Sequence, residues 1–400
     1  MRIGIDAREL VGRPTGAGRY LSGLLREWAT TGRACPHEFI LYAPDRLAIE
    51  LDSHRFATRV VSGSPGTWWE QIRMPRTAGS DHLDAFFAPA YTAPLRLNVP
   101  TVVAIHDISY VAHPEWFRTR EGLRRRWLTR QSAGRACAVV TISEFSRRQL
   151  IDELGVPGER VTVIPPGITS PAVPANRHSA REERVLFVGS ILNRRRVPDL
   201  IRAFAIVARR RSGASLDLVG DDRTYPHQDL PRTIASEGLD GRVRWHRYVS
   251  DERLSDLYSR ARVFAFLSEY EGLGLTPLEA MAVGVPPVLL DTVVARESCG
   301  DAALYVPLGG VTQTAQALEE ALADQTTRSR LLAAAPAVLA KYSWPDAARR
   351  TLALIDSSVS SPRAQVSGHG LRPPVDSRRT RVTDRSIERD GWERRRRTGD

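Results

Sequence analysis

Short continuous apolar runs, separated by segments of helical periodicity, restrict the fold of this chain more than any other feature of its sequence. Runs such as Ala85–Ala88 contain consecutive apolar residues instead of alternating apolar and polar ones. Between runs, spacings such as Leu21, Leu24 and Trp28 place apolar side chains on one helix face. Continuous apolar strands are typical of parallel sheets that helices cover on both faces. The strands predicted in the first half are Ile3–Ala7, Phe39–Tyr42, Val60–Val61, Ala85–Ala88, Val102–His106, Val139–Ile142 and Val161–Ile164.

A proline-rich polar segment, residues 168–183, divides this series from a second one and predicts a linker. A chain of 400 residues is also long enough for two or three domains. We therefore predict two doubly wound α/β domains, 1–167 and 184–343, with ligands at the carboxyl ends of the strands and in the cleft between them. The strands predicted in the second half are Val185–Gly189, Leu216–Gly220, Val243–Trp245, Val263–Phe266, Val288–Leu290 and Leu304–Val306.

The composition excludes several classes of protein. Hydrophobic residues make up 42% and charged residues 26% of the chain, as in globular proteins. No run of about 18 apolar residues could span a bilayer, and the first residues lack the pattern of a signal peptide. The three cysteines, Cys35, Cys137 and Cys299, are too few and too widely spaced for a disulfide framework or a cysteine-based zinc site. These features predict a cytoplasmic protein with reduced thiols.

The net charge of +11 arises almost entirely from arginine, since Lys341 is the only lysine. Residues 361–400 contain 11 arginines and 6 acidic residues, so the C-terminal end holds a large share of the excess. Together with its serine, proline and glycine content, this predicts a disordered, arginine-rich tail over residues 358–400. The remaining charge does not indicate specific nucleic-acid binding.

The segment 268–287 is the most informative part of the sequence. It follows an apolar strand, and Gly272 and Gly274 keep Glu271 on a loop. Thr276 as N-cap and Glu279 at the third helical position would form a capping box, a purely structural role. Alternatively, a glycine-rich loop and free helix amides form a phosphate site beside two carboxylates that suit sugar hydroxyls. The residues alone leave both interpretations open.

The spacing of Glu271 and Glu279 closely resembles the E-x7-E signature of glycosyltransferase family 4, whose members are retaining, nucleotide-sugar-dependent enzymes of the GT-B fold. Other segments match in the expected order, and the resemblance covers roughly residues 1–357. It implies two Rossmann-like domains facing a central cleft, with residues 344–357 forming a helix that crosses back to the N-terminal, acceptor-binding domain. The other matching segments are Gly16–Tyr20, Ile105–Asp107, Thr141–Ser146, Val163–Gly167, Phe187–Gly189, Arg194–Arg195, Leu200–Phe204 and Ser343–Trp344.

The resemblance also implies roles for individual residues. Glu279 would bind the ribose hydroxyls of the donor, since a carboxylate can accept from two adjacent hydroxyls. Glu271 and His106 would position the donor sugar and count as catalytic residues, although a buried histidine at a strand end is more often structural. The further donor-binding residues that the resemblance implies are Gly16, Gly18, Gly272, Leu273, Gly274, Leu275 and Thr276.

Arg194 and Arg195 would neutralise the donor diphosphate, and Arg195 would stabilise the leaving group during catalysis. The chain departs from the family here, because Ser190 stands where many members have an arginine. The run Arg194, Arg195 and Arg196 leaves open which two guanidinium groups bind phosphate.

Two further segments have competing interpretations. Trp68-Trp69-Glu70 could line the acceptor side or pack in the core. The arginine-rich segment 118–135, interleaved with Leu123 and Trp127, could lie on an anionic membrane or form a solvated basic helix. The first interpretation would place the protein peripherally at the inner face of the membrane.

We predict a hexosyltransferase that takes mannose from GDP-mannose to a saccharide or lipid-linked glycan, without a metal or other cofactor. A UDP-sugar transferase for glucose or N-acetylglucosamine, a nucleotide-sugar epimerase and a non-catalytic sugar-nucleotide binder remain alternatives. A nicotinamide-dependent oxidoreductase is disfavoured because Leu21 stands where its third glycine belongs. No D-x-D metal motif is present, and Lys341 lies outside any loop suited to pyridoxal phosphate.

Overall fold

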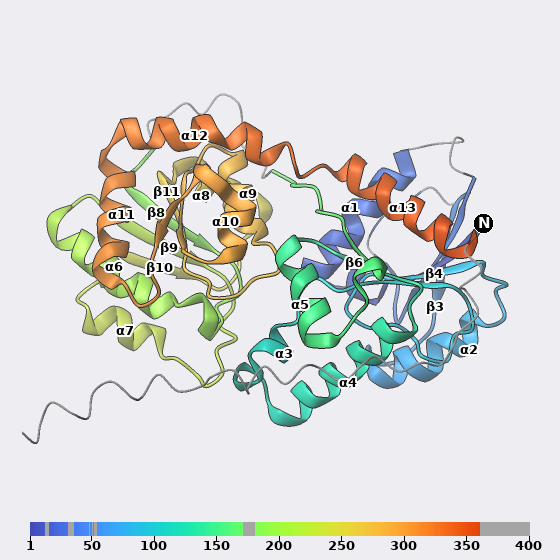
Figure 1. Ribbon diagram of the computed structural model, residues 1–400. Helices are drawn as coiled ribbons and strands as arrows, with labels where there is room; N and C mark the ends of the chain where they lie inside the picture. The colour runs from blue at the N-terminus through green and yellow to red at the C-terminus, as the bar shows by residue number, and fades with distance from the viewer. Residues whose placement is uncertain are drawn as a thin grey trace, which may run out of the picture.

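A computed structural model describes residues 1–12, 16–30, 36–47, 49, 51, 54–170 and 181–360. Within these residues the chain forms two parallel sheets, each in its own lobe (Figure 1). The first sheet has the strand order β3-β2-β1-β4-β5-β6-β7 and the second the order β10-β9-β8-β11-β12-β13. Both orders reverse direction beside the first strand of the unit, as doubly wound folds do, so the predicted α/β architecture is confirmed.

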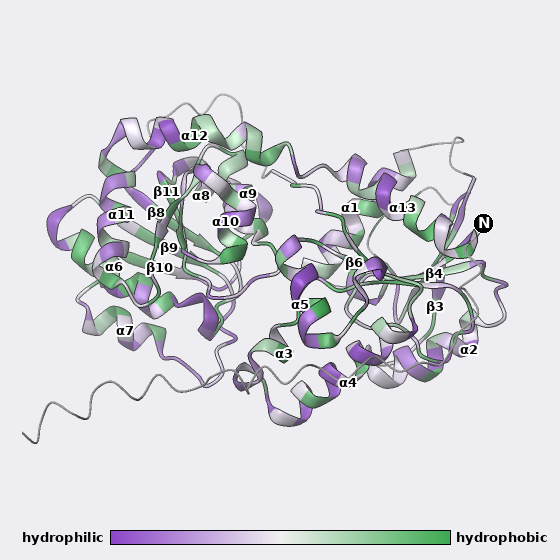
Figure 2. Cartoon of the chain, viewed as in Figure 1, coloured by the Kyte–Doolittle hydropathy of each residue, from purple (hydrophilic) through white to green (hydrophobic). Residues whose placement is uncertain are grey.

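All paired strands run parallel, and most of their side chains are buried. This agrees with the continuous apolar runs of the sequence, and Figure 2 shows strands coloured mainly as hydrophobic between helices of mixed character. The strands of the first sheet are β1 (Arg2–Asp6), β2 (Glu38–Ala43), β3 (Phe56–Val60), β4 (Ala85–Ala88), β5 (Thr101–Ala104), β6 (Ala138–Thr141) and β7 (Val161–Val163). Those of the second are β8 (Arg184–Val188), β9 (Ser215–Val219), β10 (Val243–His246), β11 (Val263–Phe266), β12 (Pro287–Leu290) and β13 (Leu304–Val306).

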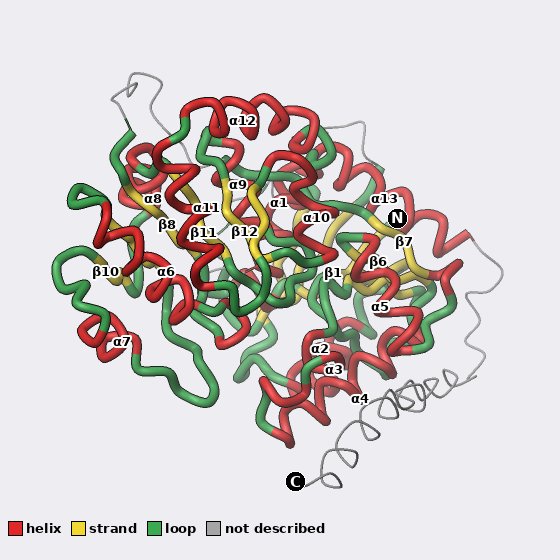
Figure 3. Tube along the Cα trace, turned by 60° about the vertical axis from the view of Figure 1, so that its left-hand side comes forward, coloured by secondary structure: helices red, strands yellow, loops and turns green. Residues whose placement is uncertain are grey.

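Helices cover the faces of both sheets (Figure 3). Those of the N-terminal half are α1 (Gly16–Thr30), α2 (Met74–Ala78), α3 (Ser109–Ala112), α4 (Thr119–Arg135) and α5 (Glu144–Leu154). Those of the C-terminal half are α6 (Val197–Arg210), α7 (Leu230–Ser236), α8 (Asp251–Arg260), α9 (Leu275–Ala282), α10 (Val293–Cys299), α11 (Val311–Ala323), α12 (Gln325–Leu339) and α13 (Trp344–Ser360). Short 3₁₀ or π turns are η1 (Arg8–Leu10), η3 (Trp69–Arg73), η4 (Pro114–Trp116), η5 (Gly158–Arg160), η6 (Asn193–Arg195) and η7 (Gly300–Ala302).

The last helix, α13, leaves the second lobe and packs on the first (Figure 1). Its residues Ala347, Ala348 and Ile355 are buried in the core that α1 and the first sheet form. The indole Nε1 of Trp28 in α1 donates to the Ala348 carbonyl at 3.0 Å. The crossover of the C-terminal helix, expected as part of the fold, is thereby confirmed.

The end of α13 corrects one predicted boundary. The helix continues to Ser360, and Ser358 is buried, so the tail does not begin at residue 358. The hydroxyls of Ser357 and Ser358 donate to the Leu354 carbonyl, as serine side chains within a helix often bond to the carbonyl of the preceding turn. Residues 361–400 and most of the predicted linker, 171–180, lie outside the described residues. The extents predicted for the two domains stay predictions.

No described helix is both long enough and apolar enough to cross a bilayer. Cys137 and Cys299 are free thiols, and Cys35 lies outside the described residues.

Candidate active site

The loop between β11 and α9 carries the two glutamates of the sequence motif. Gly274 has a φ of +86°, which favours glycine, and it starts α9 at Leu275. Thr276 is therefore inside the helix, and no side chain caps this N-terminus. The predicted capping box does not form, because the glycine turn begins the helix before Thr276. Leu273 is buried in the core of the second lobe, while Leu275 and Thr276 are half-buried.

Glu271 is fixed by a short ion pair. Its Oε1 lies 2.8 Å from Nε of Arg195 and accepts from the Ser268 hydroxyl at 2.9 Å. Burial acts to raise the pKa of Glu271, but the charges of Arg195 and Arg194 and these hydrogen bonds together lower it below its usual value. Glu271 is therefore an ionised carboxylate that orients a guanidinium group.

The side chains of the three consecutive arginines, Arg194, Arg195 and Arg196, contact different groups. Arg195 lies over the Phe266 ring, 5.0 Å from its centroid, and donates to the Ser190 carbonyl at 2.8 Å. Ser190, the departure from the family pattern, thus contributes its backbone to holding Arg195.

Arg194 reaches towards the first lobe, where its guanidinium lies 5.9 Å from the Trp116 ring centroid. Its buried Nε has no hydrogen-bond partner among the described residues. Arg196, with a φ of +49°, instead pairs with Asp199 at 2.6 Å and Glu269 at 3.5 Å. The geometry leaves Arg194 and Arg195 beside Glu271 and turns Arg196 away.

The two lobes touch where the predicted site residues meet. A Cβ added to Gly272 would lie 2.3 Å from the backbone oxygen of His106, so only glycine fits this approach without a shift. The Gly272 carbonyl accepts from the hydroxyls of Ser143 and Ser146, at 2.5 and 3.2 Å. Because His106 follows β5 and Gly272 follows β11, the carboxyl ends of both sheets face this seam.

A second contact closes the seam beside α5. The Glu297 carboxylate of α10 accepts from the backbone N–H groups of Glu144 and Phe145, at 2.6 and 2.8 Å. These amides belong to the first turn of α5, which has no other intrahelical acceptor for them. A carboxylate of one lobe thus caps a helix of the other.

His106 is buried between the rings of Tyr20 and Tyr91, whose centroids are 4.6 and 5.5 Å away. Its Nε2 lies 2.8 Å from the Pro89 carbonyl and must donate to it, since a carbonyl only accepts. Burial lowers the pKa of His106, so the ring is neutral near pH 7 and Nδ1 is left as an acceptor. This geometry suits the positioning of a hydroxyl better than general base catalysis through Nε2.

Glu279 lies in α9 and faces α1 of the other lobe. Its carboxylate is mostly buried, and Nη1 of Arg19 lies 3.4 Å from Oε1. Burial raises the pKa of Glu279 to about 7, although the Arg19 charge acts to lower it. Gly16 starts α1 and Gly18 is buried in its first turn, so the predicted glycine loop is the start of a helix.

The Trp68-Trp69-Glu70 segment divides between its two interpretations. Trp69 is buried and donates to the Val61 carbonyl at 2.6 Å, which makes it a packing residue. Glu70 is buried and accepts from Arg8 at 2.8 Å. Trp68 remains exposed.

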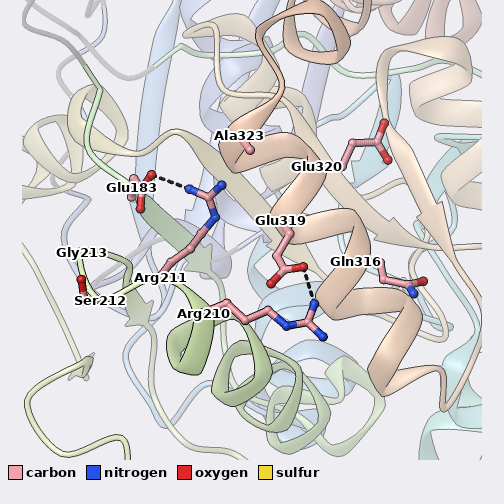
Figure 4. A pocket seen from close by; sticks show the side chains of 9 residues that line it. All are labelled: Glu183, Arg210, Arg211, Ser212, Gly213, Gln316, Glu319, Glu320 and Ala323. Atoms are coloured by element: carbon pink, nitrogen blue, oxygen red, sulfur yellow. Dashed lines mark hydrogen bonds and ion pairs between the residues drawn. The ribbon is translucent and has the colours of Figure 1, made fainter.

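One large hollow on the described surface lies far from this seam. It has a volume of about 750 Å³ and is lined mainly by charged side chains (Figure 4). Its ion pairs, Arg211 with Glu183 at 2.6 Å and Arg210 with Glu319 at 2.8 Å, satisfy one another. These residues lie at the amino ends of β8 and β9, the edge opposite to Glu271 and His106.

The structure thus gathers His106, Arg194, Arg195, Glu271 and Gly272 at one seam, with Glu279 at a second contact with α1. Sequence reasoning missed the contributions of Arg19, Ser143, Ser146 and Glu297. Arg19 lies in the segment Gly16–Tyr20 and the two serines lie in Thr141–Ser146, both of which match the family, whereas Glu297 lies in no segment that had been singled out. In the described part of the chain, no cluster of three or more His, Cys, Asp or Glu side chains could hold a metal ion.

Two facing doubly wound lobes and a crossover helix, with charged groups at the shared seam, are the architecture of the GT-B fold. Residues 14–170 match the family described as Glycosyltransferase Family 4, and residues 172–338 match Glycosyl transferases group 1. The chain belongs to glycosyltransferase family 4, as the E-x7-E motif predicted, and mannosyltransferases are among the proteins that it resembles.

Individual relatives agree with this assignment. The chain is 26% identical to O-antigen chain mannosyltransferase B of Escherichia coli over 277 residues, which cover 67% of this chain and 72% of the relative. It is 29% identical to alpha-D-kanosaminyltransferase of Streptomyces kanamyceticus over 358 residues, 78% of this chain and 92% of the relative. Sucrose-phosphate synthase from Thermosynechococcus elongatus has a similar fold, with a TM-score of 0.74, 19% identity and coverage of 90% of this chain and 99% of that structure.

Proposed function

We propose that this glycosyltransferase moves mannose from GDP-mannose to a saccharide acceptor on a lipid carrier, with retention of the anomeric configuration. The observation that supports the reaction most directly is the Glu271–Arg195 pair, held where Gly272 meets His106 across the seam. The choice of mannose follows the named relatives, of which one is a mannosyltransferase and another transfers kanosamine.

In this proposal the donor diphosphate lies against Arg194 and Arg195. Charge builds on the leaving phosphate as the glycosidic bond breaks, and a preorganised guanidinium stabilises it without reorganisation. Arg195 is suited to this because Glu271, the Ser190 carbonyl and the Phe266 ring fix its orientation. No metal ion is needed to supply the positive charge.

The remaining residues hold the donor. Glu279 accepts from the ribose hydroxyls, and Nδ1 of the neutral His106 accepts from a hydroxyl of the sugar. The acceptor approaches on the face from which the phosphate leaves, and that phosphate takes the acceptor's proton. The sugar is transferred with retention, and no protein nucleophile is required.

A donor panel tests this proposal. GDP-mannose, UDP-glucose, UDP-N-acetylglucosamine and ADP-glucose would be compared by thermal stabilisation and by hydrolysis without an acceptor. GDP-mannose should stabilise the protein most and release GDP and mannose. Glu271→Ala should abolish most of this turnover while leaving the melting temperature near that of the wild type.

Other outcomes would replace the proposal with a specific alternative. Preferential hydrolysis of a UDP-sugar would reassign the donor. Conversion of a nucleotide sugar into its epimer would indicate an epimerase, and stabilisation without turnover of any donor or acceptor would indicate a binding protein. Loss of turnover on adding EDTA, with recovery on adding a divalent cation, would contradict metal independence.

A further inference from the structure

Three of the four large apolar side chains that are exposed in the described part of the first lobe lie on helix α4 or on the loop tied to it, the fourth being Val60 of β3. Trp68, Leu123 and Trp127 are 67%, 60% and 58% exposed, whereas Trp28 and Trp69 of the same lobe are almost fully buried. Large apolar groups that are exposed together indicate an interaction site more strongly than scattered ones do.

Helix α4 has two distinct faces. Its buried face consists of Gly122, Leu128, Thr129, Ser132 and Ala133. Leu123 and Trp127 are one turn apart, so they lie together on the opposite face. At 100° per residue, Arg120 and Arg124 fall on one side of this apolar pair, and Arg126 and Arg130 fall on the other.

Trp68 extends the apolar strip beyond the helix. Nη1 of Arg124 donates to the hydroxyl of Thr67, the neighbour of Trp68, which ties this loop to α4. We call Trp68, Leu123, Trp127, Arg120, Arg124 and Arg126 the α4 surface. In Figures 1 and 3, α4 lies beside α3 on the outside of the first lobe.

The charge of the α4 surface is largely uncompensated. Helix α4 holds six arginines and one carboxylate, Glu121, which pairs with Arg125 at 2.6 Å. In the part of the chain that the structure describes, no carboxylate pairs with Arg120, Arg124 or Arg126. Arginines that flank exposed tryptophan and leucine match the headgroup region of an anionic bilayer, where aromatic rings enter and guanidinium groups meet phosphate.

We propose that the α4 surface docks the enzyme on an anionic lipid bilayer. The inference rests on the proposed function in one respect, the lipid-linked acceptor, and it adds the surface that meets the lipid. It favours a bilayer over nucleic acid because the centre of the surface is apolar and the charges flank it.

The chain path connects this surface to the seam. His106 is followed by α3, then by η4 with Trp116, and then by α4. The Trp116 ring lies beside Tyr270, at 6.3 Å between centroids, and beside Arg194. Arg118, the residue directly before α4, lies 5.8 Å from the ring centroid of Tyr225 in the second lobe, so α4 begins beside the boundary between the lobes. In this proposal a lipid-linked acceptor enters the seam from that end of the helix.

Vesicle sedimentation of the full chain tests the inference, with no donor or acceptor present. The wild type should bind vesicles of phosphatidylcholine with 30% phosphatidylglycerol and leave pure phosphatidylcholine largely unbound. The double variant Leu123→Ser/Trp127→Ser should reduce the partition coefficient at least tenfold, and Arg120→Glu/Arg126→Glu should do the same. Leu308→Ser removes an equally exposed apolar side chain from the second lobe and should bind like the wild type.

Donor hydrolysis by the same variants separates this inference from the proposed reaction. All of them should hydrolyse donor in solution at the wild-type rate, even where vesicle binding is lost. Wild-type vesicle binding by both double variants would overturn the docking surface. Loss of vesicle binding on deletion of residues 361–400, with both double variants still binding, would also overturn it. So would a short DNA duplex that abolishes vesicle binding by the wild type at every lipid composition, because the surface would then favour nucleic acid.

Discussion

Adding a single methyl group at Gly272 should separate the two lobes at the point where the site is assembled. The Cβ of Gly272→Ala would lie 2.3 Å from the His106 oxygen, 3.1 Å from its carbonyl carbon and 3.3 Å from Cβ of Asp107. Ordinary contact begins near 3.4 Å, so the loop must retreat by about 1 Å. Gly272 does not have a positive φ, so the backbone itself accepts alanine.

The expected loss follows from this displacement. Misplacing reacting groups by about 1 Å can cost about 100-fold in rate, or about 2.7 kcal/mol. Because Gly272 lies at the seam instead of in either core, the melting temperature should change little. GDP should still bind the second lobe within a few-fold of the wild-type affinity.

Steady-state turnover of donor, GDP titration calorimetry and thermal melts would be measured side by side. Gly213→Ala is the matched control, since its nearest heavy atom would be 3.8 Å from the new Cβ and its φ is also not positive. It lies at the distal edge of the second lobe, near Arg211. Wild-type turnover by Gly272→Ala would refute the idea that this contact assembles the site.

Three further predictions, with four variants, test the charges at the seam. Arg195→Ala should lower turnover of the donor sugar by roughly 100- to 1000-fold, as expected for the loss of one preorganised hydrogen-bond donor. Arg196→Ala should leave turnover within a few-fold of the wild type. Equal losses in the two variants would contradict the assignment of phosphate binding to Arg195 and not to Arg196. Glu297→Gln should raise KM and leave the melting temperature nearly unchanged, because it weakens a helix cap that joins the two lobes. An unchanged KM would contradict a role for this cap. Burial raises the pKa of Glu279 from about 4.5 in the unfolded chain to about 7, so its contribution to folding stability is present at low pH and is lost as the pH rises from about 4.5 to about 7. The melting temperature of the wild type should therefore fall relative to that of Glu279→Gln as the pH is raised from 4 to 8. The affinity of the wild type for the donor should rise over the same range, because the ionised carboxylate accepts from the ribose hydroxyls.

Much of the architecture could be predicted because it is written in local patterns. Apolar runs such as Ala85–Ala88 and Val263–Phe266 correspond to β4 and β11. A strand that is buried on both faces has apolar residues at successive positions, so it is recognised in the sequence as a continuous run. The crossover of α13 was expected only through the family resemblance. Nothing in its own amphipathic pattern says which lobe it will cover.

The start of α9 shows why local signals can mislead. Proline is tolerated anywhere in the first helical turn, so Pro277 did not fix the first position of the helix. Gly274 could adopt a positive φ and begin the helix earlier, which removed Thr276 from the capping position. The capping box was compatible with the sequence, but it could not form because the turn at Gly274 begins the helix at Leu275.

The contacts across the seam could not be predicted for a different reason. Arg19 and Glu279 are 260 residues apart, and Glu297 and Glu144 are 153 apart. A capping carboxylate normally lies within the first turn that it caps, so Glu297 gave no signal in its own segment. The sequence could not distinguish Arg196 from Arg194 and Arg195 either. Only its φ of +49° and its ion pair with Asp199 show that its side chain has different partners.

The crossover of α13 has a consequence for synthesis of the protein. Every element of the second core precedes residue 343, whereas the first core needs Ala347, Ala348 and Ile355 from the end of the chain. At about 5 to 20 residues per second, the roughly 180 residues between β7 and α13 take about 10 to 40 seconds to translate. During that interval the first lobe lacks the helix that packs on α1, so we expect the second lobe to be the first to mature on the ribosome. The order of folding would then run opposite to the order of translation, and the nascent first lobe is the part that chaperones would have to protect.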